Sequence, residues 1–269
     1  MTTHSLVEDD CRDLGFIPDG SVDLIVTHPP RLTAEAGPVT AGQLSASASY
    51  EAYLAQLDLV WEECGRVLAP GGIMTCVASA VANDESELPV AADVQVRARR
   101  FGFEARRSIR WIEPGDLDPH ESLFFETSNQ PCWDEPSWMQ DILVLRRSGQ
   151  RRSVRPEVEL DSRMPPDFYA DCAAPVWRLA REDDSMHPHG FPLALAERLV
   201  RRFSFAGDTV LDPFAGSGTT NQAAILHGRN SIAVEIEPRY FEIMADRLRD
   251  ARWPEGEITI KAEGSVVSA

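Results

Sequence analysis

The chain has 269 residues, of which 43% are hydrophobic and 26% charged, so it is long and apolar enough for one sizeable core. No stretch approaches about 18 consecutive apolar residues, which excludes a transmembrane helix, and the N-terminus lacks the basic and apolar segments of a secretory signal. We therefore expect a cytoplasmic protein without a membrane partner. The formal net charge of -17 argues against a uniformly nucleic-acid-binding surface, because phosphate neutralisation supplies much of that affinity.

The cysteine and histidine residues form neither a disulfide pattern nor a metal pattern. Five cysteines are scattered without C-x-x-C spacing, and we interpret them as buried free thiols. His187 and His189 invite a metal interpretation, but no third ligand lies near them in the sequence. The sequence therefore predicts no metal site.

The basic residues are unevenly distributed along the chain. Residues 97–110 contain six arginines and one acid, and residues 146–163 contain six arginines and three acids. Two interpretations remain open. The arginines bind an anionic ligand on one face of an acidic protein, or they pair with neighbouring carboxylates.

In chain order, the first clear element is a short buried strand. Residues 22–27 are mostly apolar and are followed by two prolines, which cannot donate to a strand ladder. Residues 31–49 are rich in small and polar residues and predict a loop. Apolar residues then recur with helical spacing over residues 50–68, Pro70-Gly71-Gly72 ends this helix, and residues 73–77 begin the next strand.

The middle of the chain has a weaker pattern. Residues 81–100 predict a helix, and residues 103–112 and 141–146 predict two strands. The remainder of residues 113–186 lacks clear periodicity, so we interpret this segment as an irregular insert that recognises a substrate. A helix returns over residues 192–203.

The last residues predict a short edge strand at 258–260 and a disordered end. Because strands alternate with helices, the chain is of the α/β class, with a mostly parallel sheet and helices on both of its faces. We expect one domain over residues 1–269, with residues 113–186 as its insert.

The strongest chemical signal is a glycine loop between two predicted strands. Residues 209–212 form an apolar strand ending in a carboxylate, and residues 213–220 carry two glycines before a helix over roughly residues 221–228. Glycines let the backbone approach a ligand closely, and a helix N-terminus offers free N–H groups. The next strand, residues 231–234, ends in Glu235, an acid placed to hold both hydroxyls of a ribose.

The glycine pattern also narrows the choice of nucleotide. The third glycine of the dinucleotide fingerprint is absent, which disfavours NAD and FAD, and the P-loop pattern is missing, which disfavours ATP. Ligands of open α/β sheets lie at the carboxyl ends of strands, where this loop is expected.

The run Asp-Pro-Phe-Ala-Gly-Ser-Gly-Thr-Thr at residues 212–220 closely resembles the cofactor motif of the DNA amino-methyltransferases, which modify N4 of cytosine or N6 of adenine. The resemblance follows the motif order of the permuted, beta-type members and is weakest over residues 113–186. The other matching segments are Asp10-Cys11, residues 17–27, 53–72, 103–114 and 141–145, His187-Pro188 and residues 191–199. It implies a class I methyltransferase with a Rossmann-like sheet in permuted order, S-adenosyl-L-methionine as cofactor and DNA as partner.

The resemblance also implies roles for individual residues. The glycine loop would line the methionine part of the cofactor, Glu235 would bind its ribose, and Asp10 its adenine amino group. Phe191 and Pro192 would cover the cofactor from the other side. The implied cofactor-binding residues are Asp10, Phe191, Pro192, Asp212, Phe214, Gly216, Ser217, Gly218, Thr219 and Glu235.

The catalytic motif departs from the family pattern. Members carry Asp, Asn or Ser, then two prolines and an aromatic residue, whereas this chain has His28-Pro29-Pro30-Arg31. In the family the first side chain and the first proline carbonyl accept hydrogen bonds from the target amine, and the aromatic residue stacks on the extruded base. Here an unprotonated nitrogen of His28 can accept one hydrogen bond. Arg31 can stack through its guanidinium plane, although it adds a positive charge beside a cationic cofactor.

Three functions remain open. The first is methyl transfer to an amino nitrogen of a DNA base, either cytosine or adenine, with residues 31–49 and 147–186 recognising the target and a homodimer or partner subunit completing the DNA contact. The second is methylation of another acceptor, such as a nucleoside-like small molecule, an RNA or a protein. The third is a non-catalytic subunit that binds the cofactor or DNA.

Overall fold

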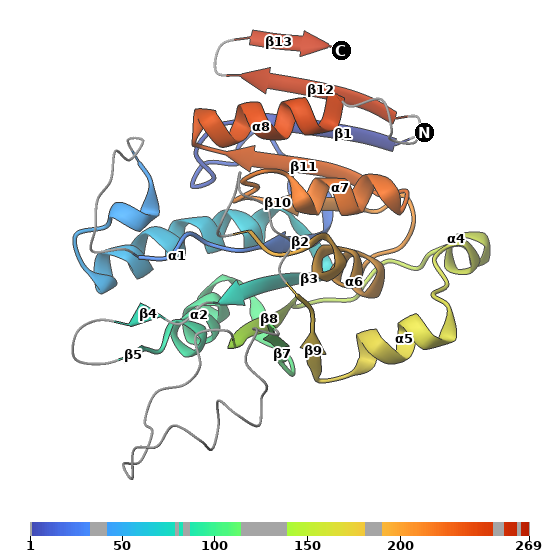
Figure 1. The fold of residues 1–269 in the computed structure, drawn as a ribbon, viewed down its shortest axis with the longest axis horizontal. Helices are drawn as coiled ribbons and strands as arrows, with labels where there is room; N and C mark the ends of the chain where they lie inside the picture. Colours follow the sequence, from blue (N-terminus) through green and yellow to red (C-terminus); the bar gives the residue numbers. More distant parts are fainter. Residues whose placement is uncertain are drawn as a thin grey trace.

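The computed structural model describes residues 2–32, 42–78, 81–82, 87–113, 139–180, 190–249, 256–262 and 265–268. Its main feature is an 11-stranded sheet with the order β13-β12-β1-β11-β10-β2-β3-β8-β7-β9, in which β6 also pairs with β8 (Figure 1). Among the described helices, none combines the length and apolar character that crossing a bilayer requires.

Six neighbouring strands of this sheet run parallel to one another. Their bounds are Gly256–Ala262 (β12), Thr2–Glu8 (β1), Asn230–Glu235 (β11), Thr209–Asp212 (β10), Val22–Thr27 (β2) and Leu68–Ala78 (β3). The antiparallel pairs of the sheet lie outside this block, between β3 and β8 (Met139–Arg147), between β8 and both β6 and β7, and between β12 and β13. The predicted mostly parallel sheet is confirmed.

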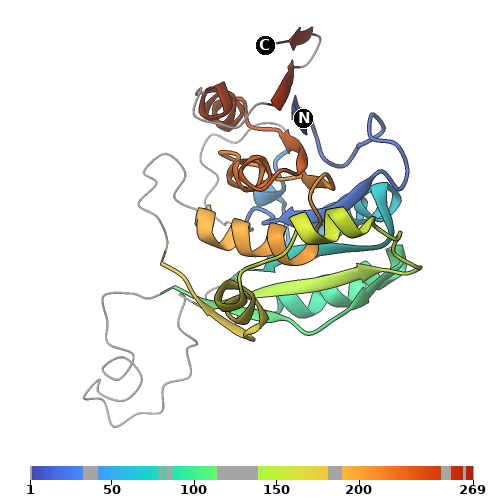
Figure 2. The same ribbon diagram turned by 90° about the vertical axis from the view of Figure 1, so that its right-hand side faces the viewer.

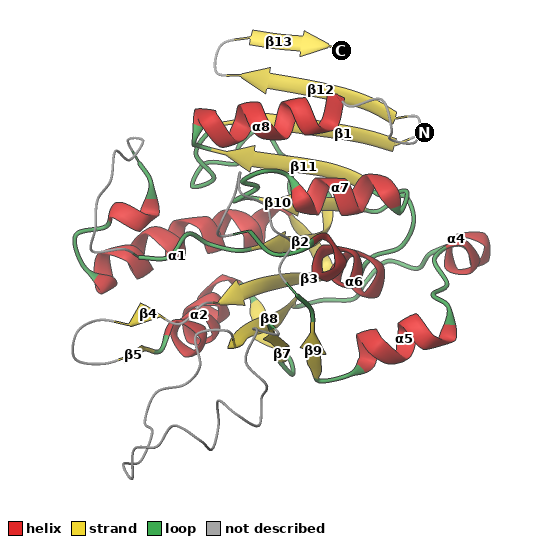
Figure 3. Cartoon of the chain, in the orientation of Figure 1, coloured by secondary structure: helices red, strands yellow, loops and turns green. Residues whose placement is uncertain are grey.

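Helices cover both faces of the sheet (Figures 2 and 3). On one face lie α1 (Tyr50–Val67) and α2 (Val90–Ala98); on the other lie α6 (Leu193–Phe203), α7 (Thr219–Leu226) and α8 (Pro238–Arg249). Strand β2 serves both faces, because Ile25 packs in the core under α1 and α2 while Leu24 and Val26 pack under α6 and α7. This arrangement confirms the predicted layers.

Helix α1 follows the sequence pattern closely. The Ser49 side chain accepts a hydrogen bond from the Ala52 backbone N–H at 3.1 Å and caps the helix. Its apolar stripe is buried, with Leu57, Val60 and Trp61 all at 0% exposure. The helix ends at Val67, one residue before its predicted end. Strand β3 begins directly at Leu68 instead of at the predicted residue 73, and Pro70-Gly71-Gly72 lie within it at a register shift.

The predicted helix at 81–100 is also too long. Among its described residues, Val90–Ala98 is α-helical and is followed by a 3-10 turn at Arg99–Phe101, and the short strands β4 (Val81–Ala82) and β5 (Glu87–Leu88) pair with each other before it. The expected strand at 103–112 is two strands, β6 (Phe103–Ala105) and β7 (Ile109–Ile112), which both pair with β8.

The strand predicted at 141–146 is confirmed as β8, which lies inside the sheet. The rest of the expected irregular segment, where the structure describes it, instead forms α4 (Pro156–Asp161), α5 (Pro166–Ala173) and the edge strand β9 (Val176–Arg178). Both helices are short and begin with a proline at the first position, so too few turns follow for a helical period to show. Residues 114–138, residues 181–186 and the pair His187 and His189 lie outside the described residues.

Two elements were not predicted, and the chain end differs from expectation. Strand β1 and helix α8 both border the cofactor loop, as the burial of Leu6, Ala215 and Met244 in one cluster shows. The predicted edge strand is the longer β12, which pairs with β1, and Ser265–Ser268 forms β13 where we expected disorder.

Candidate cofactor and acceptor site

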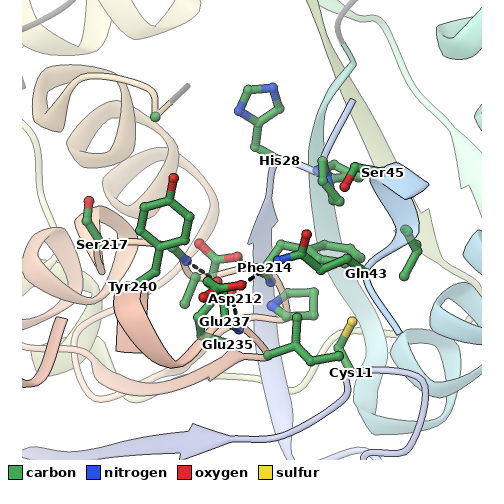
Figure 4. Close-up of a pocket in the computed structure, with 18 of the residues that line it drawn as sticks. Cys11, His28, Gln43, Ser45, Asp212, Phe214, Ser217, Glu235, Glu237 and Tyr240 are labelled. Carbon is green, nitrogen blue, oxygen red and sulfur yellow. Dashed lines mark hydrogen bonds between the residues drawn. The ribbon is translucent and has the colours of Figure 1, made fainter. Parts of the chain in front are cut away.

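A cavity of about 360 Å³ lies at the carboxyl ends of four parallel strands. Asp10 follows β1, His28 follows β2, Asp212 ends β10 and Glu235 ends β11, and all four line the cavity. Because neighbouring parallel strands end on the same side of a sheet, segments far apart in the sequence meet here. Figure 4 shows His28 above the group formed by Asp212, Phe214 and Glu235.

Most of the predicted site residues line this one cavity. They are Asp10, His28, Pro29, Pro30, Arg31, Phe191, Asp212, Phe214, Gly216, Ser217, Thr219 and Glu235. Pro192 and Gly218 are not among the lining residues. Pro192 is the N-cap of α6, behind Phe191, and Gly218 is the N-cap of α7.

The glycine loop is folded by its own turn and by Glu235. Gly216 and Gly218 have φ values of 54° and 83°, in the region that side chains rarely adopt. The Gly216 N–H donates to Glu235 Oε2 at 2.7 Å, and the Gly218 N–H donates to the Ala215 carbonyl at 2.8 Å. A Cβ at Gly218 would lie 2.7 Å from Met244 Cγ, so this glycine serves the turn and the close approach of α8.

Glu235 is nearly enclosed, with 9% exposure. The Glu237 N–H donates to its Oε1 at 2.8 Å, and Gly216 holds its other oxygen. Burial raises the pKa of Glu235, and these backbone hydrogen bonds partly oppose the rise. Each carboxylate oxygen has a second lone pair, so the side chain can still accept two hydroxyl donors.

Asp212 is more deeply buried, at 3% exposure. Its two oxygens accept hydrogen bonds from the Phe214 N–H at 3.1 Å and from Thr220 Oγ1 at 2.6 Å. Burial raises its pKa to about 7, against these two hydrogen bonds, and the charge of Glu235 adds to the rise. A cation that enters the cavity would favour the ionised form of Asp212.

Asp10 is held by an arginine two residues later. Arg12 Nε donates to both Asp10 oxygens at 2.9 Å, and the Arg12 backbone N–H donates to Oδ1 at 3.0 Å. Burial alone would raise the pKa of Asp10, but the bonds to Arg12 outweigh it and lower the pKa. The carboxylate is therefore ionised and fixed in direction.

One side of the cavity is formed by the loop that follows β2, His28–Arg31, which we call the acceptor loop after its expected role. His28, Pro29, Pro30 and Arg31 all contribute to the lining. The His28 and Phe191 rings lie with centroids 6.2 Å apart and planes inclined by 36°. Phe191 thus lies beside the acceptor loop and lines the cavity that this loop shares with the glycine loop.

Several lining residues were not predicted individually. Gln43, Leu44 and Ser45 belong to the loop 31–49 that we expected to recognise the target, and Gln43 Nε2 donates to Glu237 Oε2 at 2.7 Å, which links this segment to the loop after β11. Tyr240, on α8, lines the side near Ser217 (Figure 4). Glu237 and Tyr240 follow Glu235 closely, so their place in the sequence was a usable signal; nothing local marks Gln43.

The residues that line the cavity suit a cationic nucleoside-like ligand. Among the described residues, five carboxylates line the cavity, those of Asp9, Asp10, Asp212, Glu235 and Glu237, against one arginine. Apolar walls such as Phe191 and Phe214 accompany them, and the volume lies within the usual range for small-molecule sites, about 300–1,000 Å³. S-adenosyl-L-methionine, which has a sulfonium, an ammonium and a ribose, fits this combination.

The arginine-rich segments lie elsewhere, since none of residues 97–110 or 146–163 lines the cavity. Many of their arginines form ion pairs. Arg97 pairs with Glu51 and Asp58, and Arg151 pairs with Asp208 at 3.1 Å. For these residues the structure supports the second interpretation, pairing with neighbouring carboxylates.

Comparison with known proteins identifies the chain. A model of the DNA methylase family that covers N6 and N4 enzymes matches residues 22–246. The chain belongs to this family. In this methylase the His28–Arg31 segment precedes the glycine loop in the sequence, an order compatible with the permuted arrangement.

Relatives of the methylase span most of its length. Type II methyltransferase M.MthZI of Methanothermobacter thermautotrophicus is 26% identical over 97% of this chain and 80% of its own. DNA adenine methyltransferase YhdJ of Escherichia coli strain K12 is 31% identical over 89% of this chain and 80% of its own.

Solved structures share the fold. TTHA0409 of Thermus thermophilus, in complex with S-adenosyl-L-methionine, is 36% identical with a TM-score of 0.74, covering 94% of this chain and 99% of its own. PvuII DNA methyltransferase, which is cytosine-N4-specific, is 20% identical with a TM-score of 0.67 over 93% of this chain and 89% of its own. The methylase is therefore a class I enzyme that uses S-adenosyl-L-methionine and acts on an amino nitrogen of a DNA base.

Proposed function

We propose that the methylase transfers the methyl group at the His28–Arg31 loop, with His28 and the Pro29 carbonyl as acceptors for the target amine. The observation that carries this proposal is that the acceptor loop and the cofactor loop line the same cavity. Methyl transfer requires the nitrogen and the methyl donor to lie within reach of each other.

The cofactor-binding roles are part of the proposal. When bound, S-adenosyl-L-methionine supplies an electrophilic methyl group on its sulfonium. Glu235 accepts hydrogen bonds from the two ribose hydroxyls, Asp10 accepts one from the adenine amino group, and the loop beginning at Asp212 surrounds the methionine part. Phe191 covers the cofactor from the acceptor side. The ionised state of Asp10 and the second lone pairs of Glu235 support these assignments.

The acceptor loop orients the amine rather than reacting with it. A neutral ring nitrogen of His28 and the Pro29 carbonyl each accept one amine hydrogen, which turns the nitrogen lone pair toward the methyl donor. After transfer the amine sheds a proton, and the His28 ring nitrogen that accepted its hydrogen bond can take it.

Arg31 replaces the aromatic residue of the family pattern. Its guanidinium plane can stack on an extruded base. The five lining carboxylates offset the positive charge that it adds beside a cationic cofactor. The arginine is therefore compatible with a working acceptor site.

Labelled S-adenosyl-L-methionine and mixed-sequence duplex DNA test the proposal directly. We expect transfer of label by the wild-type chain and a decrease of about 100-fold in kcat for His28→Ala, the size of a lost acid–base group. His227→Ala is the matched control, because His227 pairs with Glu197 at 3.0 Å and does not line the cavity. Full activity of His28→Ala would show that His28 is not the hydrogen-bond acceptor for the target amine.

Two alternative functions give different results in the same assay. A wild-type chain without label transfer, combined with DNA methylation by the double variant His28→Asn, Arg31→Tyr, would indicate that the natural motif serves another acceptor. Transfer that requires a second protein would indicate a subunit of a larger enzyme.

Target recognition belongs to segments near the acceptor loop in this proposal. In the described part of residues 113–186 nothing lines the cavity, and α4 and α5 lie toward the end of the sheet where the parallel strands begin (Figure 1). A second copy of the chain or a partner subunit then completes the DNA contact, which analytical ultracentrifugation with and without duplex DNA would reveal.

A further inference from the structure

The acceptor loop cannot hold its own backbone in place. Pro29 and Pro30 are consecutive, and neither has a backbone N–H to donate. Their rings fix φ at about -65°, so the remaining freedom of the loop lies in its ψ angles. A loop of this kind needs an external donor on its carbonyl groups if their directions are to be fixed.

Tyr53 supplies such a donor from α1. Its hydroxyl donates to the Pro30 carbonyl oxygen at 3.0 Å. The side chain is 2% exposed and belongs to the core between α1 and the sheet, so its ring has little freedom to move. Burial raises the pKa of the Tyr53 hydroxyl, which therefore stays protonated and able to donate throughout the neutral range.

The space behind the loop is small. A void of about 10 Å³ lies there, lined by Pro29, Arg31 and Tyr53 together with residues of β3 and α2. This volume is at the lower limit for one water molecule. Tyr53 therefore reaches the Pro30 carbonyl directly through a closely packed region.

We propose that Tyr53 is a positioning residue for methyl transfer: by holding the Pro30 carbonyl, it fixes the directions of the Pro29 carbonyl and of His28. This inference rests on the proposed function of the acceptor loop. Between the end of β2 at Thr27 and the anchored Pro30 carbonyl, the two proline rings leave few soft torsions. One hydrogen bond at the far end of the loop is thus sufficient to limit the orientation of both acceptor groups.

The chain contains a matched control for this residue. Tyr50 lies on the same helix with its ring centroid 6.4 Å from that of Tyr53, and its hydroxyl also donates a hydrogen bond, to Asp93 Oδ2 at 2.7 Å. Tyr50 is not among the described residues that line the cavity, and its hydroxyl bonds to α2 rather than to the acceptor loop. Tyr53→Phe and Tyr50→Phe therefore each remove one tyrosine hydroxyl from the same helix, but only Tyr53→Phe releases the acceptor loop.

The experiment compares the two variants with the wild-type chain. We expect Tyr53→Phe to lower kcat for duplex DNA about tenfold, which corresponds to about 1.4 kcal/mol in activation free energy. The Kd for S-adenosyl-L-methionine, measured by calorimetry, should stay within about twofold, because the cofactor loop is untouched. Tyr50→Phe should leave kcat within about twofold of wild type.

Nuclear magnetic resonance provides a readout that does not depend on activity. With labelled histidine, the His28 ring should show greater mobility in Tyr53→Phe than in the wild-type chain, and no change in Tyr50→Phe. Unchanged His28 mobility in Tyr53→Phe would overturn the inference, whether or not the wild-type chain methylates DNA. A wild-type chain that does not methylate DNA would refute the proposed function separately. Equal losses of kcat and Tm in both variants would also overturn it, because they would indicate only a loss of helix stability.

Discussion

At the scale of single residues, burial of the Asp212 carboxylate carries an electrostatic cost in the cavity. Its carboxylate is 3% exposed, and burial raises its pKa to about 7. The pKa of an aspartate in an unfolded chain is about 3.9. Between that pH and about 7, the folded chain therefore holds a proton on Asp212 that the unfolded chain has released. A cation bound beside Asp212 would favour the carboxylate, so we expect cofactor binding at the proposed site to release a proton from Asp212.

Asp212→Asn separates the proposed role of Asp212 in cofactor binding from its effect on the stability of the fold. The amide keeps an oxygen for Thr220 or Phe214 but has no charge, so we expect the affinity for S-adenosyl-L-methionine to fall about 10- to 100-fold, as for a lost charged hydrogen bond. The ligand-free variant should be at least as stable as wild type at pH 8, because a buried charge is removed. Calorimetric Kd and Tm measured at pH 8 check both parts. An unchanged Kd would contradict the cofactor role of Asp212.

At the scale of elements, the cavity depends on how closely α7 and α8 approach. Gly218 is the N-cap of α7 with a φ of 83°, and Met244 of α8 fills the space where a side chain would lie. Gly207 has a similar φ of 79°, but nothing lies within 4 Å of the Cβ position. Both glycines therefore have a left-handed backbone, but only Gly218 is packed against a neighbouring side chain.

Alanine at these two glycines should give unequal losses of stability. We expect Gly207→Ala to cost about 1 kcal/mol for the left-handed backbone. Gly218→Ala should cost about 1–3 kcal/mol more, because its Cβ displaces Met244. Urea unfolding measures both values. Equal costs would show that α8 adapts without strain.

The elements that the sequence predicted are those with local signals. The strand, glycine loop and Glu235 were recognised because turn, strand end and acid lie within one short segment, whereas β1 has only Leu6 and Val7 as apolar residues among its described positions. Helix α8 does have a helical period at Phe241, Met244, Ala245 and Leu248, so it was predictable and was missed. The bonds from Gln43 to Glu237 and from Tyr53 to Pro30 join segments 194 and 23 residues apart, and only the folded sheet brings such residues together.

At the scale of the whole molecule, two buried groups give opposite responses to acid. His4, at 1% exposure, bonds to Ser231 Oγ at 2.8 Å, and burial lowers its pKa to about 4. Because the unfolded chain protonates this histidine near pH 6.5, His4 makes the folded state less stable as pH falls from about 6.5 to 4. The raised pKa of Asp212 makes the folded state more stable over the same fall, so the two effects oppose each other.

Single variants should separate these opposing effects. Each group contributes at most about 1.4 kcal/mol per pH unit to the free energy of unfolding. His4→Gln should therefore lose less stability than wild type between pH 7 and pH 5, and Asp212→Asn should lose more. Urea unfolding at several pH values checks the signs. Parallel pH profiles for the two variants would contradict the assignment.

The position of β1 has a consequence for how the protein is made. This strand lies between β11 and β12, and His4 meets Ser231 across 227 residues of sequence. On the ribosome, residues 2–8 emerge long before either neighbour exists, so their edges stay unpaired until β11 and β12 have been translated. The wall of the cavity that contains Asp9 and Asp10 is consequently assembled only after β11 is available. A chain that stops before β11 lacks both the strand that pairs with β1 and the carboxylate of Glu235.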